Sequence, residues 1–361
     1  MQVDDFLKKM VACGGSDAHL KVGKAPGVRI SGEIQPQGTE PLRPEHTEAI
    51  ARALLDADQW ATFEADGDLD CSYSIPGTAR FRVNVMRQRG SISLVLRYIP
   101  QQIPTFEQLG LPEICKTISM RPRGLVLVTG PTGSGKSTTL AAMIDLINAT
   151  MQGHVLTMED PIEFMHNDKK CYVNQREVGA DTKNFNEALR RALRQDPDVI
   201  LIGEMRDLET ISLAVTAAET GHLVFGTLHT TSAVKTIDRI VNVFPPDAQT
   251  QIRLQLSGTL QGIISQTLVP KVGGGRVAAL EVLVATDSVR AIIRENKMAQ
   301  LMTSMQTGKK SGMQTLEDHL NALVAARQIT YEEAVGKANL PQAIKAPAGA
   351  EPARQPAGTV A

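Results

Sequence analysis

The stretch GLVLVTGPTGSGKSTTL, residues 124–140, predicts the core of the fold. Its four apolar residues at 125–128 are typical of a buried parallel strand. The glycines that follow allow a tight turn whose backbone N–H groups point inward. Residues 137–148 then have helical periodicity, and the positive end of that helix dipole favours an anionic phosphate. A flexible Gly/Ser connection is the alternative, but strand, loop and helix come in the order that a phosphate loop requires.

The loop itself fits the pattern G-x-x-x-x-G-K-[ST] at residues 130–137. In this pattern the lysine, here Lys136, reaches the terminal phosphates of a nucleotide, and the hydroxyl group of Ser137 ligates Mg²⁺. We therefore expect nucleotide contacts from one continuous segment: Thr132, Gly133, Ser134, Gly135, Lys136, Ser137 and Thr138.

Length and composition limit the possible functions. The 361 residues are enough for two or three domains, and the net charge of −1 gives no strongly basic surface for direct nucleic-acid binding. The four cysteines are far apart in sequence and form no C-x-x-C pair, which indicates reduced, cytosolic thiols. No apolar run approaches the roughly 18 residues of a membrane span, and no signal peptide begins the chain. We expect a soluble protein that works at a membrane only through partners.

Residues 1–100 predict a small α+β domain with an arginine-lined sheet. A helix at 1–13, a hairpin around 28–30 and a helix at about 43–65 precede two strands, RFRVNVM and SISLVLRYI. Arginines are crowded in these strands and include Arg82 and Arg97. They are either ordinary solvated residues of a strand face or cations that reach a phosphate.

The rest of the chain predicts a linker, an α/β domain and a tail. Prolines in 101–120 are typical of a linker. From 121 to 345, apolar runs alternate with helical stretches, which indicates a parallel sheet. We expect its last part, from about 245, to be mainly helical with one hairpin-like segment, KVGGGRVAALEVLVA. The Pro/Ala/Gly-rich residues 346–361 predict disorder.

Polar residues follow the predicted strands at the edge where ligands bind in parallel sheets. Glu163 follows the strand at 154–158, and Glu204 follows the strand at 199–202. Glu204 is placed to polarise water or to hold Mg²⁺ through water, although capping a helix is its alternative role. His229 follows the strand at 223–228 and is a candidate sensor of the terminal phosphate. His222 precedes that strand, so we expect a structural or inter-subunit role for it.

These motifs together closely resemble the PilT family, the type IV pilus retraction ATPases of the secretion-ATPase superfamily. The resemblance covers nearly the whole chain apart from the tail. It rests on segments similar to the family's Walker A loop, Asp box, Walker B motif and His box: GPTGSGKST (130–138), MEDPIEF (158–164), VILIGEMRDLET (199–210) and TGHLVFGTLHT (220–230).

The resemblance implies roles for single residues. Glu163 and Glu204 would be the catalytic acidic pair, with Glu204 the base for water and either of them able to hold Mg²⁺ through water. His229 would sense the phosphate. Arg82 and Arg97 fall where the superfamily draws phosphate-clamping arginines from its N-terminal domain.

The resemblance also implies an architecture: a PAS-like α+β domain joined to a RecA-like P-loop ATPase core, assembled as a homo-hexamer that uses ATP and Mg²⁺. Its motion would pass to a PilC-like inner-membrane platform protein from the cytoplasmic face of that membrane. A paralogous retraction ATPase is a further expected partner. The segment SVRAIIRE, residues 288–295, is similar to the family's AIRNLIRE motif, with four substitutions.

Several hypotheses for the activity follow. The leading one is a motor that hydrolyses ATP to retract the pilus, and an accessory, PilU-like paralogue is its nearest alternative. A pilus-extension or type II secretion ATPase would generally carry a further N-terminal domain and a tetracysteine metal site. A non-hydrolysing scaffold would not need Lys136, Glu163, Glu204 and His229 together. A RecA-like DNA translocase would need a basic surface.

Overall fold

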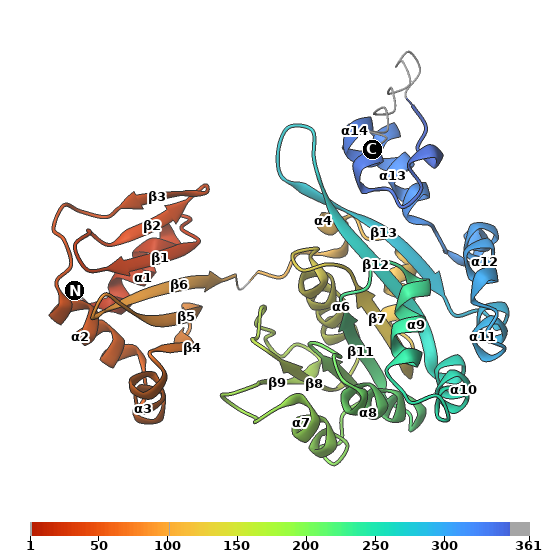
Figure 1. Cartoon of the computed structure of the whole chain (residues 1–361), viewed down its shortest axis with the longest axis horizontal. Coiled ribbons are helices and arrows are strands. Elements are labelled where there is room, and N and C mark those ends of the chain that lie inside the picture. Colours follow the sequence, from red (N-terminus) through yellow and green to blue (C-terminus); the bar gives the residue numbers. More distant parts are fainter. Residues whose placement is uncertain (1, 101, 347–361) are drawn as a thin grey trace, which may run out of the picture. The chain divides into compact units, whose positions relative to one another are not determined.

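The computed structural model describes residues 2–100 and 102–346, which form two compact units. The first unit comprises Met1–Gln102 and Pro161–His166, and the second comprises Ile103–Asp160 and Asn167–Ala361. Figure 1 labels the helices and strands of each unit. The predicted disordered tail lies, apart from residue 346, outside the described residues. Among those residues, no helix combines the length and the apolar character that crossing a membrane requires.

The first unit is built on a six-stranded antiparallel sheet in the order β3-β2-β1-β6-β5-β4. Alternate residues of β5 are buried, which places its apolar face on the core and its arginine face outward. Arg82 on β5 and Arg97 on β6 are direct register partners. The strands are β1 (Asp17–Lys21), β2 (Gly27–Ile30), β3 (Glu33–Pro36), β4 (Asp68–Ile75), β5 (Ala79–Gln88) and β6 (Ser91–Ile99).

Three helices complete this unit: α1 (Val3–Ala12), α2 (Pro44–Leu54) and α3 (Ala57–Asp66). The prediction of one helix over about 43–65 is therefore wrong. Leu55 has extended dihedrals and ends α2. Asp56 then accepts a hydrogen bond from the Gln59 amide at 2.8 Å, and the Gln59 side chain accepts one from the Asp56 amide, so a capping box starts a new helix.

The second unit contains a seven-stranded sheet in the order β13-β12-β7-β11-β10-β8-β9. All neighbouring pairs are parallel except β12 and β13. Because the carboxyl ends of the parallel strands meet at one edge, the loops that follow β7, β8, β10 and β11 lie there together. The strands are β7 (Gly124–Thr129), β8 (Gly153–Glu159), β9 (Cys171–Glu177), β10 (Val199–Ile202), β11 (Leu223–Leu228), β12 (Leu260–Pro270) and β13 (Arg276–Val284).

Helices connect these strands and cover the sheet (Figure 1). The connection that carries α6 leads from β7 to β8, toward the β9 edge of the sheet. The connections that carry α7, α8, α9 and α10 lead from β9 to β10, β11 and β12 in turn, toward the opposite edge. Right-handed crossovers therefore place α6 and the others on opposite faces. The bounds are α6 (Lys136–Thr150), α7 (Phe185–Ala192), α8 (Leu208–Glu219), α9 (Ala233–Asn242) and α10 (Gln249–Thr259).

Most of the predicted linker, 101–120, belongs to the second unit. It forms two short helices, α4 (Phe106–Leu109) and α5 (Glu113–Ser119), which pack against α6. Phe106, Cys115 and Ile118 are buried in the core of that unit. Burial of these side chains explains why a stretch with several prolines is folded here and is not an extended spacer.

The C-terminal part also differs from the prediction. The expected hairpin, 271–285, contains the turn and β13, but its other strand is β12, which lies in the stretch predicted to be helical, and both are long strands of the main sheet. β12 pairs with β7 in parallel, and this pairing buries its apolar residues in the core. The remaining helices are α11 (Asp287–Arg294), α12 (Leu301–Thr307), α13 (Leu316–Ala325) and α14 (Tyr331–Lys337), with 3-10 turns at Met298–Gln300, Gly308–Ser311 and Pro341–Ala343.

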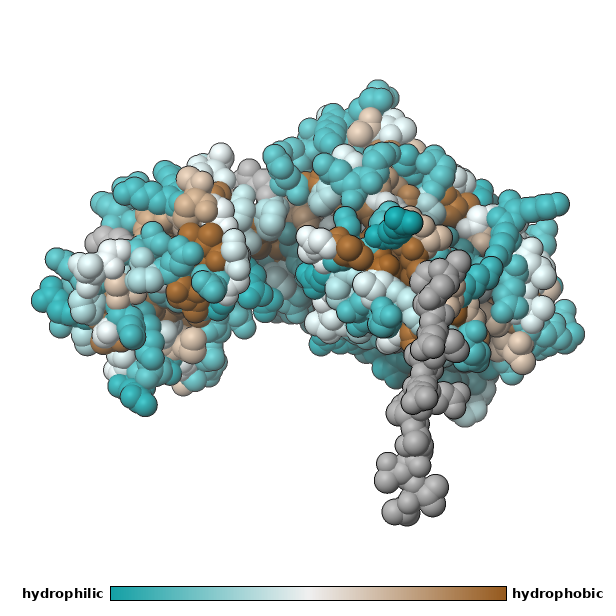
Figure 2. All heavy atoms as spheres, turned by 90° about the horizontal axis from the view of Figure 1, so that it is seen from above, coloured by the Kyte–Doolittle hydropathy of each residue, from teal (hydrophilic) through white to brown (hydrophobic). Residues whose placement is uncertain are grey.

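On the face seen in Figure 2, hydrophobic residues form small patches separated by polar ones. The apolar side chains are mainly internal, in one core for each unit and a third, smaller core between α13, α14 and the β12–β13 pair.

Candidate functional site

The phosphate loop has a backbone that needs glycine. Gly130 has a φ of 145° and Gly135 a φ of 88°, in the region that L side chains rarely adopt. A Cβ atom on Gly130 would lie 2.2 Å from the Gln266 carbonyl oxygen. The loop is therefore seated directly against β12, and a larger residue at position 130 would push it away.

Polar groups of the loop are arranged for an anion. The ammonium group of Lys136 donates hydrogen bonds to the carbonyl oxygens of Gly130 at 2.9 Å and Pro131 at 3.2 Å, which holds a positive charge against the loop. The hydroxyl group of Ser134 is buried and has no hydrogen-bond partner among the described residues. Ser137 and Thr138 lie half-buried in the first turn of α6. A phosphate group would match this set of donors.

Gln266 is a residue of the site that the sequence reasoning missed. Its amide nitrogen donates to the Ser134 carbonyl oxygen at 2.7 Å, and its amide oxygen accepts from the Thr139 hydroxyl group at 2.9 Å. It thus joins the loop to α6. A signal was present in the sequence, because a buried glutamine inside the apolar run GIISQTLV needs a specific partner.

A pocket of about 850 Å³ adjoins the phosphate loop within the second unit. Its apolar wall comes from the segment before β7 and from the β12–β13 pair, and the start of α6 forms another side. The lining residues include Leu109, Leu111, Gly135, Thr138, Thr139, Leu268, Val277 and Ala278. A pocket of this size, which polar residues such as Glu107, Lys271 and Arg276 also line, suits a ring system that carries polar groups.

Glu204 and His229 are brought together by neighbouring strands. Glu204 follows β10, His229 follows β11, and His229 Nε2 lies 2.8 Å from Glu204 Oε1. Arg206 also forms an ion pair with Glu204. Burial raises the pKa of Glu204, but the hydrogen bonds and charges of Arg206 and His229 outweigh it and hold that pKa below its usual value. Glu204 is therefore an ionised acceptor at neutral pH.

Glu163 and Glu204 belong to different units of the structure. Glu163 is exposed and belongs to the segment Pro161–His166 of the first unit. In the second unit, Asp160 follows β8, and the last residue of that strand is Glu159. It accepts hydrogen bonds from Thr157 at 2.7 Å and Gln175 at 3.2 Å. Sequence reasoning did not select Glu159, although it stands in the same acidic cluster.

Hydroxyl and carboxylate oxygens at this edge suit Mg²⁺, which prefers hard oxygen ligands and keeps several waters. Ser137 would supply the hydroxyl group from α6, and Glu204 would act from the end of β10. The orphaned Ser134 hydroxyl group and the loop-bound Lys136 ammonium favour the phosphates that normally accompany this ion.

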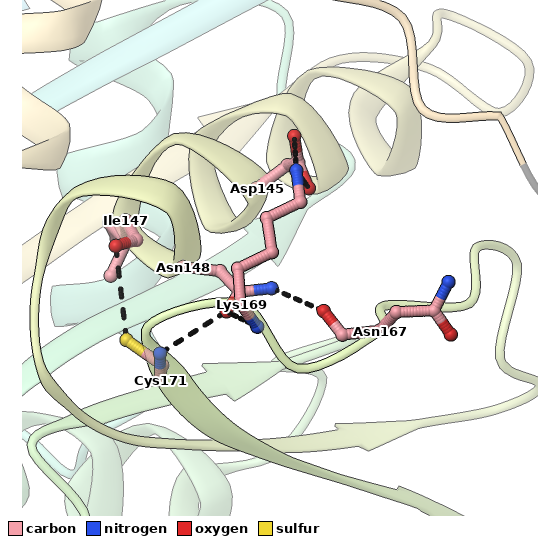
Figure 3. Close-up of polar contacts among 6 residues, drawn as sticks. All are labelled: Asp145, Ile147, Asn148, Asn167, Lys169 and Cys171. Carbon is pink, nitrogen blue, oxygen red and sulfur yellow. Dashed lines mark hydrogen bonds and ion pairs between the residues drawn. The ribbon is translucent and has the colours of Figure 1, made fainter.

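The far end of the phosphate-loop helix is also fixed (Figure 3). Asn148, buried near the end of α6, donates to the Asn167 carbonyl oxygen at 2.7 Å and accepts from the Lys169 amide at 3.0 Å. The Lys169 ammonium group binds the Asp145 carboxylate at 2.7 Å. These contacts tie α6 to the chain that follows Pro161–His166 and enters β9, so the helix is anchored at both ends.

In the first unit, Arg97 is already engaged. Its Nε donates to Asp17 Oδ1 at 2.7 Å, while Arg29 lies 3.7 Å from the other carboxylate oxygen. Asp17 is buried, yet the Arg97 side chain is 69% exposed. Asp17 therefore orients a guanidinium group that still faces outward, next to its register partner Arg82.

His222 lies before β11, at the opposite end of that strand from His229. Its Nδ1 is 2.9 Å from the Ala217 carbonyl oxygen near the end of α8, and its own carbonyl oxygen accepts from the Gly124 amide at 2.9 Å. These contacts join α8 to the start of β7, as a structural residue would.

Comparison with known proteins gives the family. The model of the Type II/IV secretion system protein family matches residues 65–274. The chain is 53% identical over 342 residues to the Pseudomonas aeruginosa protein named "Type IV pilus retractation ATPase PilT", covering 95% of this chain and 99% of that protein. The chain belongs to the PilT family. The prediction from its motifs is confirmed.

Solved structures of relatives share the whole fold. The structure described as the pilus retraction motor PilT with bound ADP superposes with a TM-score of 0.89 at 48% identity, covering 95% of this chain and 98% of that one. The Legionella pneumophila ATPase DotB gives 0.81 at 29% identity over 92% of this chain and 93% of its own. The α/β fold class expected from the phosphate loop is thus confirmed. The chain is also similar to the P. aeruginosa "Type IV pilus ATPase PilU", at 42% identity over 94% of this chain and 89% of that protein.

Proposed function

We propose that this chain is a motor ATPase that hydrolyses ATP to power type IV pilus retraction and so twitching motility. The observation that carries the proposal is the phosphate loop beside the Glu204–His229 pair, in a chain that matches a retraction ATPase over nearly its full length. A nucleotide-bound relative with the same fold supports ATP as the substrate.

In the proposed reaction, the loop amides and Lys136 hold the phosphates, and the pocket beside Leu268 takes the base and ribose. Mg²⁺, held through Ser137 and through water by Glu204 or Glu163, offsets phosphate charge when bound. Glu204 orients and deprotonates the attacking water, and His229 senses the terminal phosphate while holding the carboxylate in place. Thr132, Gly133, Ser134, Gly135 and Thr138 complete the phosphate contacts.

The wider assembly is part of the same proposal. Arg82 and Arg97 would clamp the phosphates of a neighbouring subunit in a homo-hexameric ring, since both present guanidinium groups from one sheet face. The 1–100 domain would be PAS-like and the 121–345 domain RecA-like. The ring would act at the cytoplasmic face of the inner membrane on a PilC-like platform protein, with no direct nucleic-acid contact.

Lys136→Ala tests the activity. We expect phosphate release to fall to background because the terminal phosphates lose their lysine, while the circular dichroism spectrum is unchanged. Lys310→Ala is the control, since Lys310 is exposed on the 3-10 turn after α12. Normal turnover by Lys136→Ala would refute the phosphate-loop assignment.

Mixing two inactive variants tests whether the site is shared between neighbouring subunits. Lys136→Ala and Arg97→Ala subunits would each be inactive alone. A mixture regains turnover if arginine and phosphate loop come from different subunits, because some interfaces then hold both intact. No recovery in rings shown by mass spectrometry to be mixed would reject the shared site.

An accessory, PilU-like role is the second candidate, supported by the substitutions in SVRAIIRE and the 42% identity to PilU. Deleting the gene separates the two, since loss of the main motor leaves excess surface pili and loss of an accessory motor leaves retraction only weakened. An assembly motor has less support, because the P. aeruginosa assembly ATPase PilB matches only 57% of this chain.

A further inference from the structure

Glu281 is a buried acid beside the candidate site that the proposed reaction does not use. It lies on β13, in register with Ser265 of β12, which is in register with Thr129, the last residue before the phosphate loop. The Thr129 and Ser265 hydroxyl oxygens are 2.8 Å apart. A row of polar residues therefore crosses three strands of the sheet at the level where the loop begins.

Glu281 is only 2% exposed, and the two oxygens of its carboxylate differ in their contacts. Oε1 accepts a hydrogen bond from the Ala233 amide at 2.6 Å. Oε2 is buried and meets no hydrogen-bond partner in residues 2–100 and 102–346. A carboxylate is costly to bury in this way, so a side chain that only filled space would be better apolar.

Ala233 is the first residue of α9, and the segment from His229 leads directly into it. This connection is short and internally bonded. The Thr236 hydroxyl group donates to the Ser232 carbonyl oxygen at 2.7 Å and lies 2.6 Å from the Thr230 hydroxyl group. A displacement of the start of α9 would therefore be passed to His229.

A pocket of about 160 Å³ lies at Glu281, with room for about five water molecules. It is lined by Pro131 of the phosphate loop, Thr231 of the segment after His229, and Leu316, Lys337 and Asn339 of the C-terminal helical part. Glu281 thus stands where the loop, the segment carrying His229 and the C-terminal helices meet.

We propose that Glu281 is a positioning residue for His229: by binding the first amide of α9 it fixes the 229–232 segment relative to the phosphate loop. The inference rests on the proposed ATPase function. Glu281 does not touch the reacting atoms, so its effect must be exerted through His229.

Glu317 provides a matched control for a purely structural role. It is 6% exposed, and it accepts a hydrogen bond from the Leu340 amide at 3.0 Å, away from His229 in sequence and in contacts. Glu281→Met and Glu317→Met both remove a buried acceptor and keep side-chain length. Glu281→Gln retains a carbonyl oxygen for the Ala233 amide.

The experiment is steady-state ATP hydrolysis by the full chain, with Tm measured for each variant. We expect Glu281→Met to lower kcat at least tenfold with KM changed less than about threefold, and Glu281→Gln to restore most of the rate. Glu317→Met should lower Tm but keep kcat. In a His229→Ala background, Glu281→Met should have no further effect on kcat. Equal kcat losses in both Met variants, wild-type kcat in Glu281→Met, or multiplicative losses with His229→Ala would each overturn the proposal.

If Glu281→Met does not fold, Ala233→Pro removes the same hydrogen bond from the other side. Proline is well tolerated at the first position of a helix, and Ser232 has the extended dihedrals that precede proline. We expect the same loss in kcat, and a normal kcat would overturn the proposal. Wild-type protein without ATPase activity would instead reject the proposed function itself.

Discussion

Glu204 Oε1 lies 2.8 Å from His229 Nε2, at the ends of the neighbouring parallel strands β10 and β11. The contact couples two residues that lie 25 positions apart in the sequence. It fixes the carboxylate, and it requires the histidine proton on Nε2 when the ring is neutral. Replacing His229 therefore also alters how the Glu204 carboxylate is held, so the effects of the two substitutions on kcat should not be independent.

We predict strongly non-additive effects at this pair. Glu204→Gln should lower kcat about 100-fold or more, and His229→Ala by a similar order, because general-base catalysis of this kind contributes roughly 10²–10⁴-fold. The double variant should be little slower than Glu204→Gln alone. Phosphate release measures all three, and Glu332→Gln at an exposed position of α14 is the control. Losses that simply multiply would show that the two residues act independently.

We predict that Asp17→Asn destabilises the first unit. Burial raises the pKa of Asp17, but its hydrogen bonds with Arg97 and Ser16 outweigh this and leave that pKa below its ordinary value. A lowered folded pKa gives stability that is present above the unfolded pKa of about 4 and is lost as pH falls through the folded pKa. The expected loss is about 1 kcal/mol at pH 7, read from urea unfolding. The difference from wild type should shrink toward pH 3, and a constant difference would contradict this assignment.

We predict that Leu268→Glu raises KM for ATP about tenfold or more. The new carboxylate would enter the pocket beside the phosphate loop and repel the nucleotide. Val272→Glu introduces the same charge at an exposed position, 58% accessible, in the turn between β12 and β13. That control should leave KM unchanged. Equal KM values for both variants would show that the base and ribose of ATP do not bind in the pocket beside Leu268.

We predict that Glu281 makes stability depend on pH near neutrality. Burial raises its pKa to about 7, and the nearby charge of Glu317 adds to this, whereas the Ala233 amide and Lys235 oppose it. Lys337 lines the same pocket. A raised folded pKa gives stability that is complete below the unfolded pKa of about 4.5 and is lost as pH rises through about 7.

Glu281→Gln should therefore gain stability relative to wild type as pH rises from 5 to 8, by an amount on the order of 3 kcal/mol. Denaturant unfolding at several pH values measures the difference, and Glu332→Gln, at an exposed position of α14, serves as the comparison variant. An unchanged difference between Glu281→Gln and wild type across this range would mean that Glu281 keeps one protonation state throughout.

Several elements followed from local sequence. β7, β11 and α6 begin or end within a residue or two of their predicted bounds, because apolar runs and glycine positions act over short distances. The prediction of one helix over about 43–65 is wrong because a capping box at Asp56 starts a second helix, α3. The predicted hairpin is present as β12 and β13, but β12 itself falls in the stretch predicted to be helical, because its other partner, β7, lies far away in sequence.

By itself, the sequence determined the phosphate loop, since Gly130, Lys136 and Ser137 stand in one continuous segment whose conformation is set by its own residues. The tertiary structure decided the rest of the site. Gln266 and Glu281 come from strands whose register places them beside the loop, and Glu204 meets His229 only because β10 and β11 are neighbours. Pairing of distant strands depends on the burial of the whole sheet, and no short pattern of residues encodes it.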